Sequence, residues 1–193
     1  MSSHALPNIL LNDFSKDILL RLPPNFYKSL RSYISNQDIK KIQKAYTLAF
    51  YAHEGQERKD GSKYITHPIA VANILLDLKM DTDSICAALM HDVLEDCDVN
   101  KKDLIKLFGD DVAEIVDGVS KLSNLDIANR SERDANNLQK MMLAISKDIR
   151  VVLVKICDRL HNMRTIEHLP RSKQLEKSKE TCLLYTSPSP RDS

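Results

Sequence analysis

Apolar residues return every three or four positions along most of this chain, a spacing that predicts α-helices rather than β-strands. Ahead of the clearest run, Ser35 stands three residues before Asp38, an acidic variant of the capping box that begins many helices. We therefore expect a helix from about residue 36 to His53 that stops at Gly55. Its apolar face is formed by Ile39, Ile42, Tyr46, Ala49 and Phe50.

The rest of the chain keeps this organisation. The polar segment 56–66 is expected to be a loop, and helices are expected over residues 68–76, 82–96, 101–108, 112–119 and 138–145. Asp81 or Thr82 is expected to cap the second of these helices. Residues 150–156 are apolar and β-branched, which local propensity alone would assign to a buried strand. Since no second strand is predicted nearby, we expect a deeply buried helix there.

Composition narrows the fold to an all-α helical bundle. The chain has 193 residues, enough for one ordinary domain, and only four glycines. Lys and Arg (28) nearly balance Asp and Glu (27), whereas a general nucleic-acid binder would carry a basic excess. We expect a partly helical N-terminal extension (1–35), a single domain (36–185) and a non-native or disordered tail (186–193) of low complexity.

The chain shows no sign of a membrane or export segment. No apolar run reaches the roughly 18 residues needed to cross a bilayer, and the N-terminus lacks the basic and apolar segments of an export signal. The cysteines include no C-x-x-C pair and are interpreted as reduced core thiols. They are Cys86, Cys97, Cys157 and Cys182. We expect a cytoplasmic protein.

The most informative polar residues lie in a helix that is otherwise apolar. His91 and Glu95 are four residues apart, as are Asp92 and Asp96, so neighbouring stripes of the helix each present a polar pair. Burying such groups would cost several kcal/mol unless they are paired, and a divalent cation binds both imidazole and carboxylate. For these four residues alone, a solvated acidic helix end is an equally good interpretation.

Two more polar residues extend this pattern. His67 stands where a loop meets a helix, and Asp158 follows the apolar run, on one helical face with Asn162 and Thr165. Taken singly, His67 would more often be a cap or core residue, and Asp158 the ion-pair partner of an arginine. Together with the pair at 91–92, they supply two imidazoles and two carboxylates, a set suited to Mn²⁺, Fe or Zn²⁺.

Basic residues crowd the loop before His67, namely Arg58, Lys59 and Lys63. They could clamp phosphates, although solvated loop charges are the simpler interpretation of these residues alone. The chain contains no H-E-x-x-H zinc helix, P-loop, Rossmann glycine motif or nucleophile elbow.

Five ordered motifs are informative as a set. They are Ala-His-Glu-Gly-Gln-Glu-Arg-Lys-Asp-Gly at 52–61, Tyr-Ile-Thr-His-Pro at 64–68, Ala-Ala-Leu-Met-His-Asp-Val-Leu-Glu-Asp at 87–96, Asp-Gly-Val-Ser-Lys-Leu at 117–122 and Asp-Arg-Leu-His-Asn-Met-Arg-Thr at 158–165. Over about residues 39–185, the chain resembles the N-terminal hydrolase domain of the RelA/SpoT alarmone enzymes, a branch of the HD phosphohydrolase superfamily.

The resemblance implies an all-α HD-domain bundle that hydrolyses the 3′-pyrophosphate of (p)ppGpp, the alarmone of the stringent response, to GDP or GTP and pyrophosphate. It implies that Glu95 and Asp96 position or activate the attacking water. It implies that Mn²⁺ is held by His67, His91, Asp92 and Asp158. It also implies that the nucleotide is contacted by Arg58, Lys59, Asn162 and Thr165.

The chain departs from the family at two places. Residues 135–141 (Ala-Asn-Asn-Leu-Gln-Lys-Met) stand where the family often has Ala-Glu-Asn-Phe-Arg-Lys-Met, and Asp60 adds a negative charge near the expected phosphates. Two other functions therefore stay open, an HD phosphohydrolase for another nucleotide and a catalytically silent regulatory module. The abrupt tail suggests a fragment of a long member with a C-terminal synthetase domain, although compact members contain the hydrolase alone.

Overall fold

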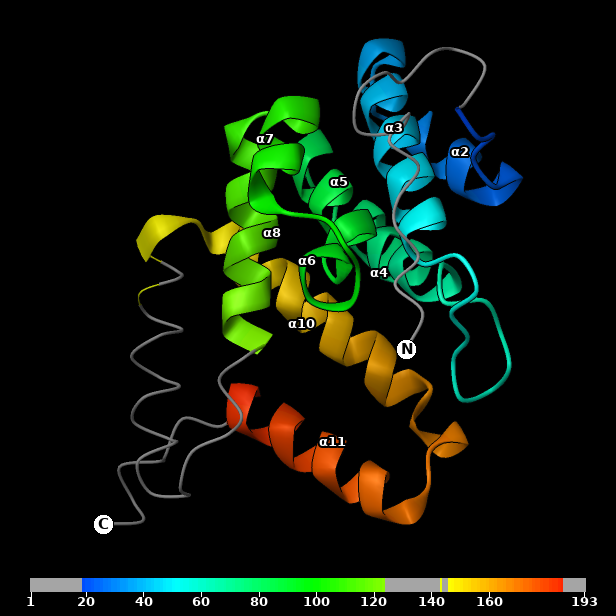
Figure 1. Cartoon of the computed structure of the whole chain (residues 1–193), viewed down its shortest axis with the longest axis vertical. Helices are drawn as coiled ribbons and strands as arrows, with labels where there is room; N and C mark the ends of the chain where they lie inside the picture. Colours follow the sequence, from blue (N-terminus) through cyan, green and yellow to red (C-terminus); the bar gives the residue numbers. More distant parts are fainter. Residues whose placement is uncertain (1–18, 124–142, 144–145, 186–193) are drawn as a thin grey trace.

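The computed structural model describes residues 19–123, 143 and 146–185, and every regular element in these ranges is a helix (Figure 1), which confirms the all-α prediction. Except for Leu143, the helix expected at 138–145 lies outside the described residues, as does the tail at 186–193. None of the described helices is long and apolar enough to cross a membrane. The elements are α2 (Pro24–Leu30), α3 (Asn36–Ala52), α4 (Thr66–Asp77), α5 (Thr82–Met90), α6 (Val93–Asp96), α7 (Lys101–Phe108), α8 (Asp110–Ser123), α10 (Ile149–Arg164), η1 (Ile166–His168) and α11 (Arg171–Tyr185).

The predicted helix ends are set by local side-chain and backbone chemistry. The side chain of Ser35 accepts a hydrogen bond from the amide of Asp38 at 3.2 Å, and that of Asp81 accepts one from the amide of Ser84 at 3.1 Å. These caps satisfy amides that have no partner within α3 and α5. Helix α7 ends at Gly109, whose φ of 89° favours glycine.

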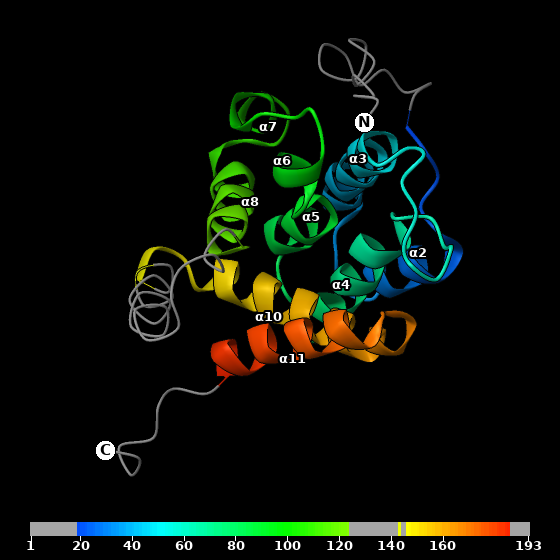
Figure 2. The ribbon, with the colours of Figure 1, turned by 60° about the horizontal axis from the view of Figure 1, so that its bottom comes forward.

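The short helix α5 forms the centre of the core. Every residue from Ser84 to Met90 is buried, and α3, α4, α8 and α10 pack around the helix (Figures 1 and 2). A helix that is apolar on all sides is stable only when it is surrounded in this way. Cys86 and Cys157 are buried free thiols, as predicted, whereas Cys97 is only partly buried. The C-terminal end of α5 therefore emerges inside the molecule, at the fully buried His91.

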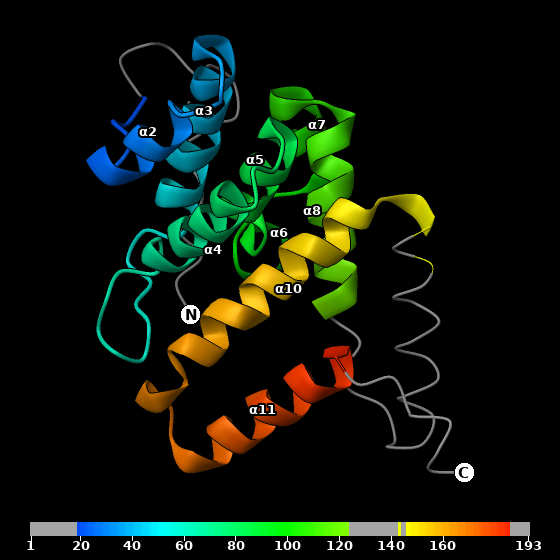
Figure 3. The ribbon, with the colours of Figure 1, turned by 180° about the vertical axis from the view of Figure 1, so that it is seen from behind.

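Helix α10 contains the β-branched run at 150–156, so the prediction of a buried helix is confirmed. Val151 and Val154 are buried in the core, and this burial outweighs the local preference for a strand. A Cβ built on Gly118 of α8 would lie 2.8 Å from Cγ2 of Val151, so glycine permits the close approach of α8 and α10. The polar helix α11 runs alongside α10 on its other side (Figures 2 and 3).

One prediction about the helices is wrong. The apolar spacing predicts a continuous helix over 82–96, whereas α5 ends at Met90 and a separate helix, α6, begins at Val93. Nδ1 of His91 hydrogen-bonds to the carbonyl oxygen of Ala88 at 2.8 Å. In a continuous helix this oxygen would accept from the amide of Asp92, so the imidazole competes with the helix for it.

Candidate metal centre

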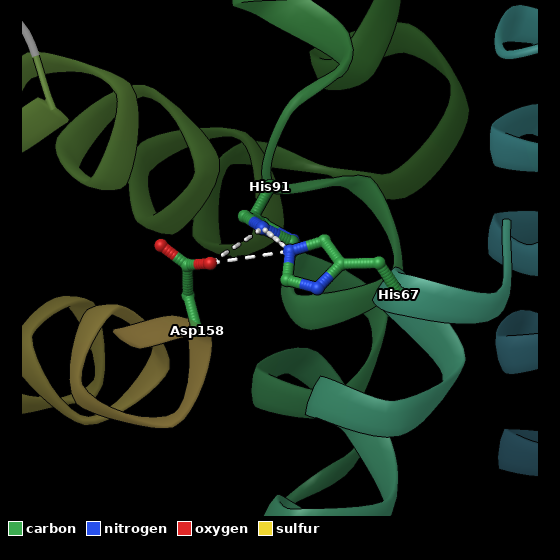
Figure 4. Close-up of side chains that lie close together, drawn as sticks. All are labelled: His67, His91 and Asp158. Carbon is green, nitrogen blue, oxygen red and sulfur yellow. Dashed lines mark hydrogen bonds and ion pairs between the residues drawn. The ribbon is translucent and has the colours of Figure 1, made fainter. Parts of the chain in front are cut away.

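Three side chains from three helices point toward one another at the C-terminal end of α5 (Figure 4). His67 lies in the first turn of α4, His91 directly follows α5, and Asp158 lies in α10. The Nε2 atoms of His67 and His91 are 3.2 Å apart, and Oδ1 of Asp158 is 3.1 Å from the first and 3.7 Å from the second. One ligand atom from each residue lies within 4.8 Å of the other two, so the three side chains could hold a metal ion.

Asp92 adds a second carboxylate to this cluster. Its Oδ2 lies 3.1 Å from Nε2 of His91 and 3.8 Å from Nε2 of His67. Two imidazole nitrogens and two carboxylate oxygens thus gather at one place, drawn from α4, α10 and the break between α5 and α6. This mixed nitrogen and oxygen donor set fits a divalent transition metal.

Each imidazole is also held through its other ring nitrogen. Because a carbonyl oxygen only accepts, Nδ1 of His91 donates to Ala88, which leaves Nε2 facing the cluster. Nδ1 of His67 lies 2.7 Å from Nδ1 of His161, and one of these two nitrogens donates to the other. Such contacts are typical of metal-binding histidines, because they fix both the ring and the nitrogen that binds.

The charges of this cluster are buried and depend on one another. Nζ of Lys155 lies 3.1 Å from Oδ2 of Asp158, and each side chain is 6% exposed. Burial alone would raise the pKa of Asp158, but hydrogen bonds with His67 and His91 hold that pKa well below its ordinary value. Burial alone would lower the pKa of His91, but the charge of Asp92 raises it well above the ordinary value. The ionised carboxylates of Asp92 and Asp158 are therefore stable in this buried cluster only because positively charged or hydrogen-bonding groups lie next to them.

Three residues of the cluster, His67, Asp92 and Asp158, line a cavity of about 440 Å³, whereas His91 is fully buried beside them. The predicted nucleotide-binding residues Arg58, Lys59, Asn162 and Thr165 all line this cavity. Nδ2 of Asn162 donates to Oδ1 of Asp158 at 2.7 Å. Nη2 of Arg58 donates to Oγ1 of Thr165 at 3.2 Å, so the loop before α4 is tied to the end of α10 beside the cavity.

The two residues predicted to act on water are placed differently. Glu95 lines the cavity, whereas Asp96 is not among the lining residues, and its Oδ2 lies 3.4 Å from the hydroxyl of Tyr64. Burial, and after it the charge of Asp92, raises the pKa of Asp96 above its ordinary value. A carboxylate with a raised pKa accepts a proton more readily, which suits a general base.

Two charged residues of the loop before α4 lie at the edge of the site. Lys63 is exposed and is not among the residues that line the cavity. Asp60 does line the cavity, and its Oδ1 accepts a hydrogen bond from the amide of Ser62 at 2.9 Å. The hydrogen bonds from Ser62 lower the pKa of Asp60. The added negative charge of Asp60 therefore serves the turn of its own loop.

Several residues at the site receive no role from the sequence pattern, namely Tyr64, Lys155, Arg159, His161 and Lys177. Tyr64 and His161 lie inside recognised motifs, but their contacts appear only in the folded structure: His161 contacts His67 where α10 packs against α4, and Tyr64 contacts Asp92 at the break between α5 and α6. Lys155 precedes Asp158 by three residues in α10, a spacing that could have suggested the pair. Lys177 lies in α11, whose polar sequence does not indicate which side faces the cavity.

Comparison with known proteins gives the class to which this fold and site belong. Residues 45–190 match the family model of the HD domain, and the chain belongs to this family. A solved structure, that of a metazoan ortholog of SpoT that hydrolyzes ppGpp and plays a role in starvation responses, aligns with a TM-score of 0.57 and 28% identity. That alignment covers 79% of this chain and 87% of the other.

Within the HD domain family, the predicted resemblance to the RelA/SpoT enzymes is confirmed. The chain is 47% identical over 155 residues to the guanosine-3′,5′-bis(diphosphate) 3′-pyrophosphohydrolase of Vibrio cholerae, covering 80% of this chain and 22% of that protein. It is 45% identical over 157 residues to the bifunctional (p)ppGpp synthase/hydrolase SpoT of Escherichia coli K12, covering 81% and 22%. The chain thus spans about a fifth of the length of these relatives.

Proposed function

We propose that this domain hydrolyses the 3′-pyrophosphate of (p)ppGpp to GDP or GTP and pyrophosphate, with Mn²⁺ as the divalent cation. The observation that carries the proposal is the gathering of four metal-binding groups beside a cavity whose lining includes Arg58 and Lys59. We assign the metal to His67, His91, Asp92 and Asp158. The names of the relatives support the substrate, because they describe enzymes of this nucleotide.

The proposed reaction is a hydrolysis in which water gives its hydroxyl group to a phosphorus atom. The oxygen of water forms a bond to the phosphorus attached to the 3′ oxygen, the bond between that phosphorus and the 3′ oxygen breaks, and the 3′ oxygen takes a proton. A divalent cation, when bound, would lower the pKa of the water and offset negative charge on the phosphate oxygens. We assign the positioning or activation of this water to Glu95, which lines the cavity, and to the neighbouring Asp96.

Substrate binding is assigned to the other walls of the cavity. Arg58 and Lys59 bring positive charge from the loop before α4, and guanidinium groups match phosphate oxygens in geometry as well as in charge. Asn162 and Thr165 bring hydrogen-bonding groups from the end of α10. The expected cytoplasmic location stays a prediction.

The proposal is tested by release of pyrophosphate from ppGpp with and without Mn²⁺. His91→Ala removes a proposed ligand, and Asp92→Asn removes the negative charge of another. Each is expected to lower turnover at least ~100-fold, equivalent to about 2.7 kcal/mol of transition-state stabilisation. Asp83→Asn is a matched control, because Asp83 lies in α5 but pairs with Lys41 at 2.7 Å. This variant should keep wild-type turnover.

Each outcome separates the candidate functions. Wild-type turnover in both ligand variants would show that the site assignment is wrong. A preference for nucleotides that lack a 3′-pyrophosphate would favour another HD phosphohydrolase. A folded protein that binds no divalent cation would indicate a silent regulatory module.

A further inference from the structure

Tyr64 is the last residue but one before α4, and the backbone holds it beside the candidate metal centre. Its amide donates to the carbonyl oxygen of Gln56 at 3.0 Å, across the base of the loop. Its own carbonyl oxygen accepts from the amide of His67 at 2.9 Å. The loop and the first turn of α4 therefore fix Tyr64 and His67 relative to each other.

The ring of Tyr64 lies between two histidines. It stacks on the ring of His53, with centroids 4.4 Å apart and an angle of 25° between the planes. Its edge meets the ring of His67, with centroids 6.0 Å apart and an angle of 75°. His53 and His67 are both buried, so these contacts leave the phenol ring little freedom to turn.

The hydroxyl of Tyr64 reaches two carboxylates with assigned roles. It donates to Oδ2 of Asp92 at 2.6 Å and makes a longer contact of 3.4 Å with Oδ2 of Asp96. An ionised carboxylate only accepts, so the direction of the shorter bond is not ambiguous. Oδ2 of Asp92 is also the oxygen that lies 3.1 Å from Nε2 of His91. The hydroxyl thus holds the oxygen that faces the candidate ligands.

We propose that Tyr64 is a positioning residue that aims Oδ2 of Asp92 at the metal site through its hydroxyl and keeps Asp96 beside it. Asp92 lies in the break between α5 and α6, and its carboxylate can turn about its terminal torsion unless a neighbour holds it. The inference deepens the proposed function and rests on it, because Asp92 is a ligand only in that function.

Tyr64→Phe removes the hydroxyl and keeps the ring that stacks on His53. Loss of such an outer contact typically weakens metal affinity about 10- to 100-fold, and we expect Mn²⁺ affinity to fall at least ~10-fold. At saturating Mn²⁺, kcat for ppGpp should fall because Asp96 loses its link. KM should stay within about twofold, because the assigned nucleotide contacts are untouched.

The matched control is Tyr33→Phe. The hydroxyl of Tyr33 donates to the carbonyl oxygen of Met80 at 2.8 Å, and Tyr33 does not line the cavity. Mn²⁺ dissociation constants are measured by isothermal titration calorimetry, at a temperature at which circular dichroism shows the metal-free variants to be folded. The unfolding temperature in EDTA measures the structural cost of losing each hydroxyl, and only Tyr64→Phe should bind Mn²⁺ more weakly.

The results distinguish failure of the inference from failure of the proposed function. If wild type binds Mn²⁺ and hydrolyses ppGpp, and Tyr64→Phe matches it in affinity and kcat, the inference is overturned and the function stands. If kcat and affinity fall only as far as in Tyr33→Phe, the hydroxyl has a structural role alone and the inference is also overturned. If wild type neither binds Mn²⁺ nor releases pyrophosphate, the proposed function fails, and the inference falls with it.

Discussion

Two clusters of charged side chains in this domain use the same chemical groups in opposite settings. In the buried cluster, Lys155 lies 3.1 Å from Asp158, with 6% of each side chain exposed. In the surface cluster between α7 and α8, Asp117 lies 2.9 Å from Lys101 and 2.7 Å from Lys121. These two lysine side chains are 33% and 73% exposed. The pairs are similar in distance and differ in their access to water.

Access to water decides what each cluster can contribute. Exposed ion pairs stabilise a fold by about 1 kcal/mol at most, because water and salt screen them. A buried pair loses several kcal/mol of hydration, so it seldom adds stability beyond what apolar residues would give. A buried pair that includes one of the four candidate metal ligands is therefore better explained by the chemistry of the site than by stability. The surface cluster is explained by the ion pair that links α7 to α8.

The largest expected effect on stability comes from breaking the buried pair. Lys155→Met keeps much of the side-chain volume but leaves the carboxylate of Asp158 without its ammonium partner. We expect a loss of about 3 kcal/mol in the free energy of unfolding, the lower end for a broken buried pair, because His67 and Asn162 still contact Asp158. Urea unfolding followed by circular dichroism in EDTA measures the loss.

A double variant sharpens this test. Lys155→Met combined with Asp158→Leu removes both charges, and part of the lost stability should return, since apolar residues often replace a buried pair at no net cost while His67 and Asn162 lose their acceptor. A loss below about 1 kcal/mol in Lys155→Met alone would mean that the buried pair behaves like an exposed one. The contrast between the two clusters would then be wrong.

The fold was largely predictable because most of its helices carry local signals. Ser35 and Gly109 mark helix ends through capping and backbone freedom, which depend on a few neighbouring residues. The break at His91 was not predictable, because it depends on an imidazole that takes the carbonyl of its own helix while facing residues from α4 and α10. Hydrophobic spacing carries no information about that competition.

The candidate site was predictable as a set of residue types, and its supporting contacts were not. His67, His91 and Asp158 converge as their residue types suggested, whereas the contact of Tyr64 with Asp92 appears only after packing. The motif at 117–122 gives the opposite lesson. Its sequence is as specific as that of the other motifs. In the structure, however, Asp117 accepts hydrogen bonds from Lys101 and Lys121, and Gly118 leaves room for the side chain of Val151, so these contacts hold helices together.

A smaller effect is expected from the surface cluster. Lys101→Met removes the contacts of Lys101 with Glu114 and Asp117, and should lower the free energy of unfolding by no more than about 1 kcal/mol. Lys102→Met, at an exposed position in the same helix, is the matched control. The difference between these variants should shrink at high salt, because screening weakens exposed pairs. A loss as large as that of Lys155→Met would contradict the contrast between the two clusters.

The smallest effect is a pH dependence of stability that belongs to Asp117. Partial burial alone would raise the pKa of Asp117, but hydrogen bonds from Lys121 and Lys101 hold it below its ordinary value. Because the folded state lowers this pKa, the contribution of Asp117 is fully present above about pH 4, near the unfolded pKa, and is lost as the pH falls through the folded pKa. Solvent around the lysines limits the contribution to about 1 kcal/mol or less.

Asp117→Asn should therefore differ from wild type in the free energy of unfolding at pH 6 and converge with it as the pH falls below about 4. The comparison requires urea unfolding of both proteins at each pH, so that titration of the remaining carboxylates cancels in the difference. Lys121→Met should remove part of the same dependence, because Lys121 holds the shorter of the two contacts with Asp117. A difference that stayed constant across this range would show that Asp117 acts by packing between α7 and α8 rather than by its charge.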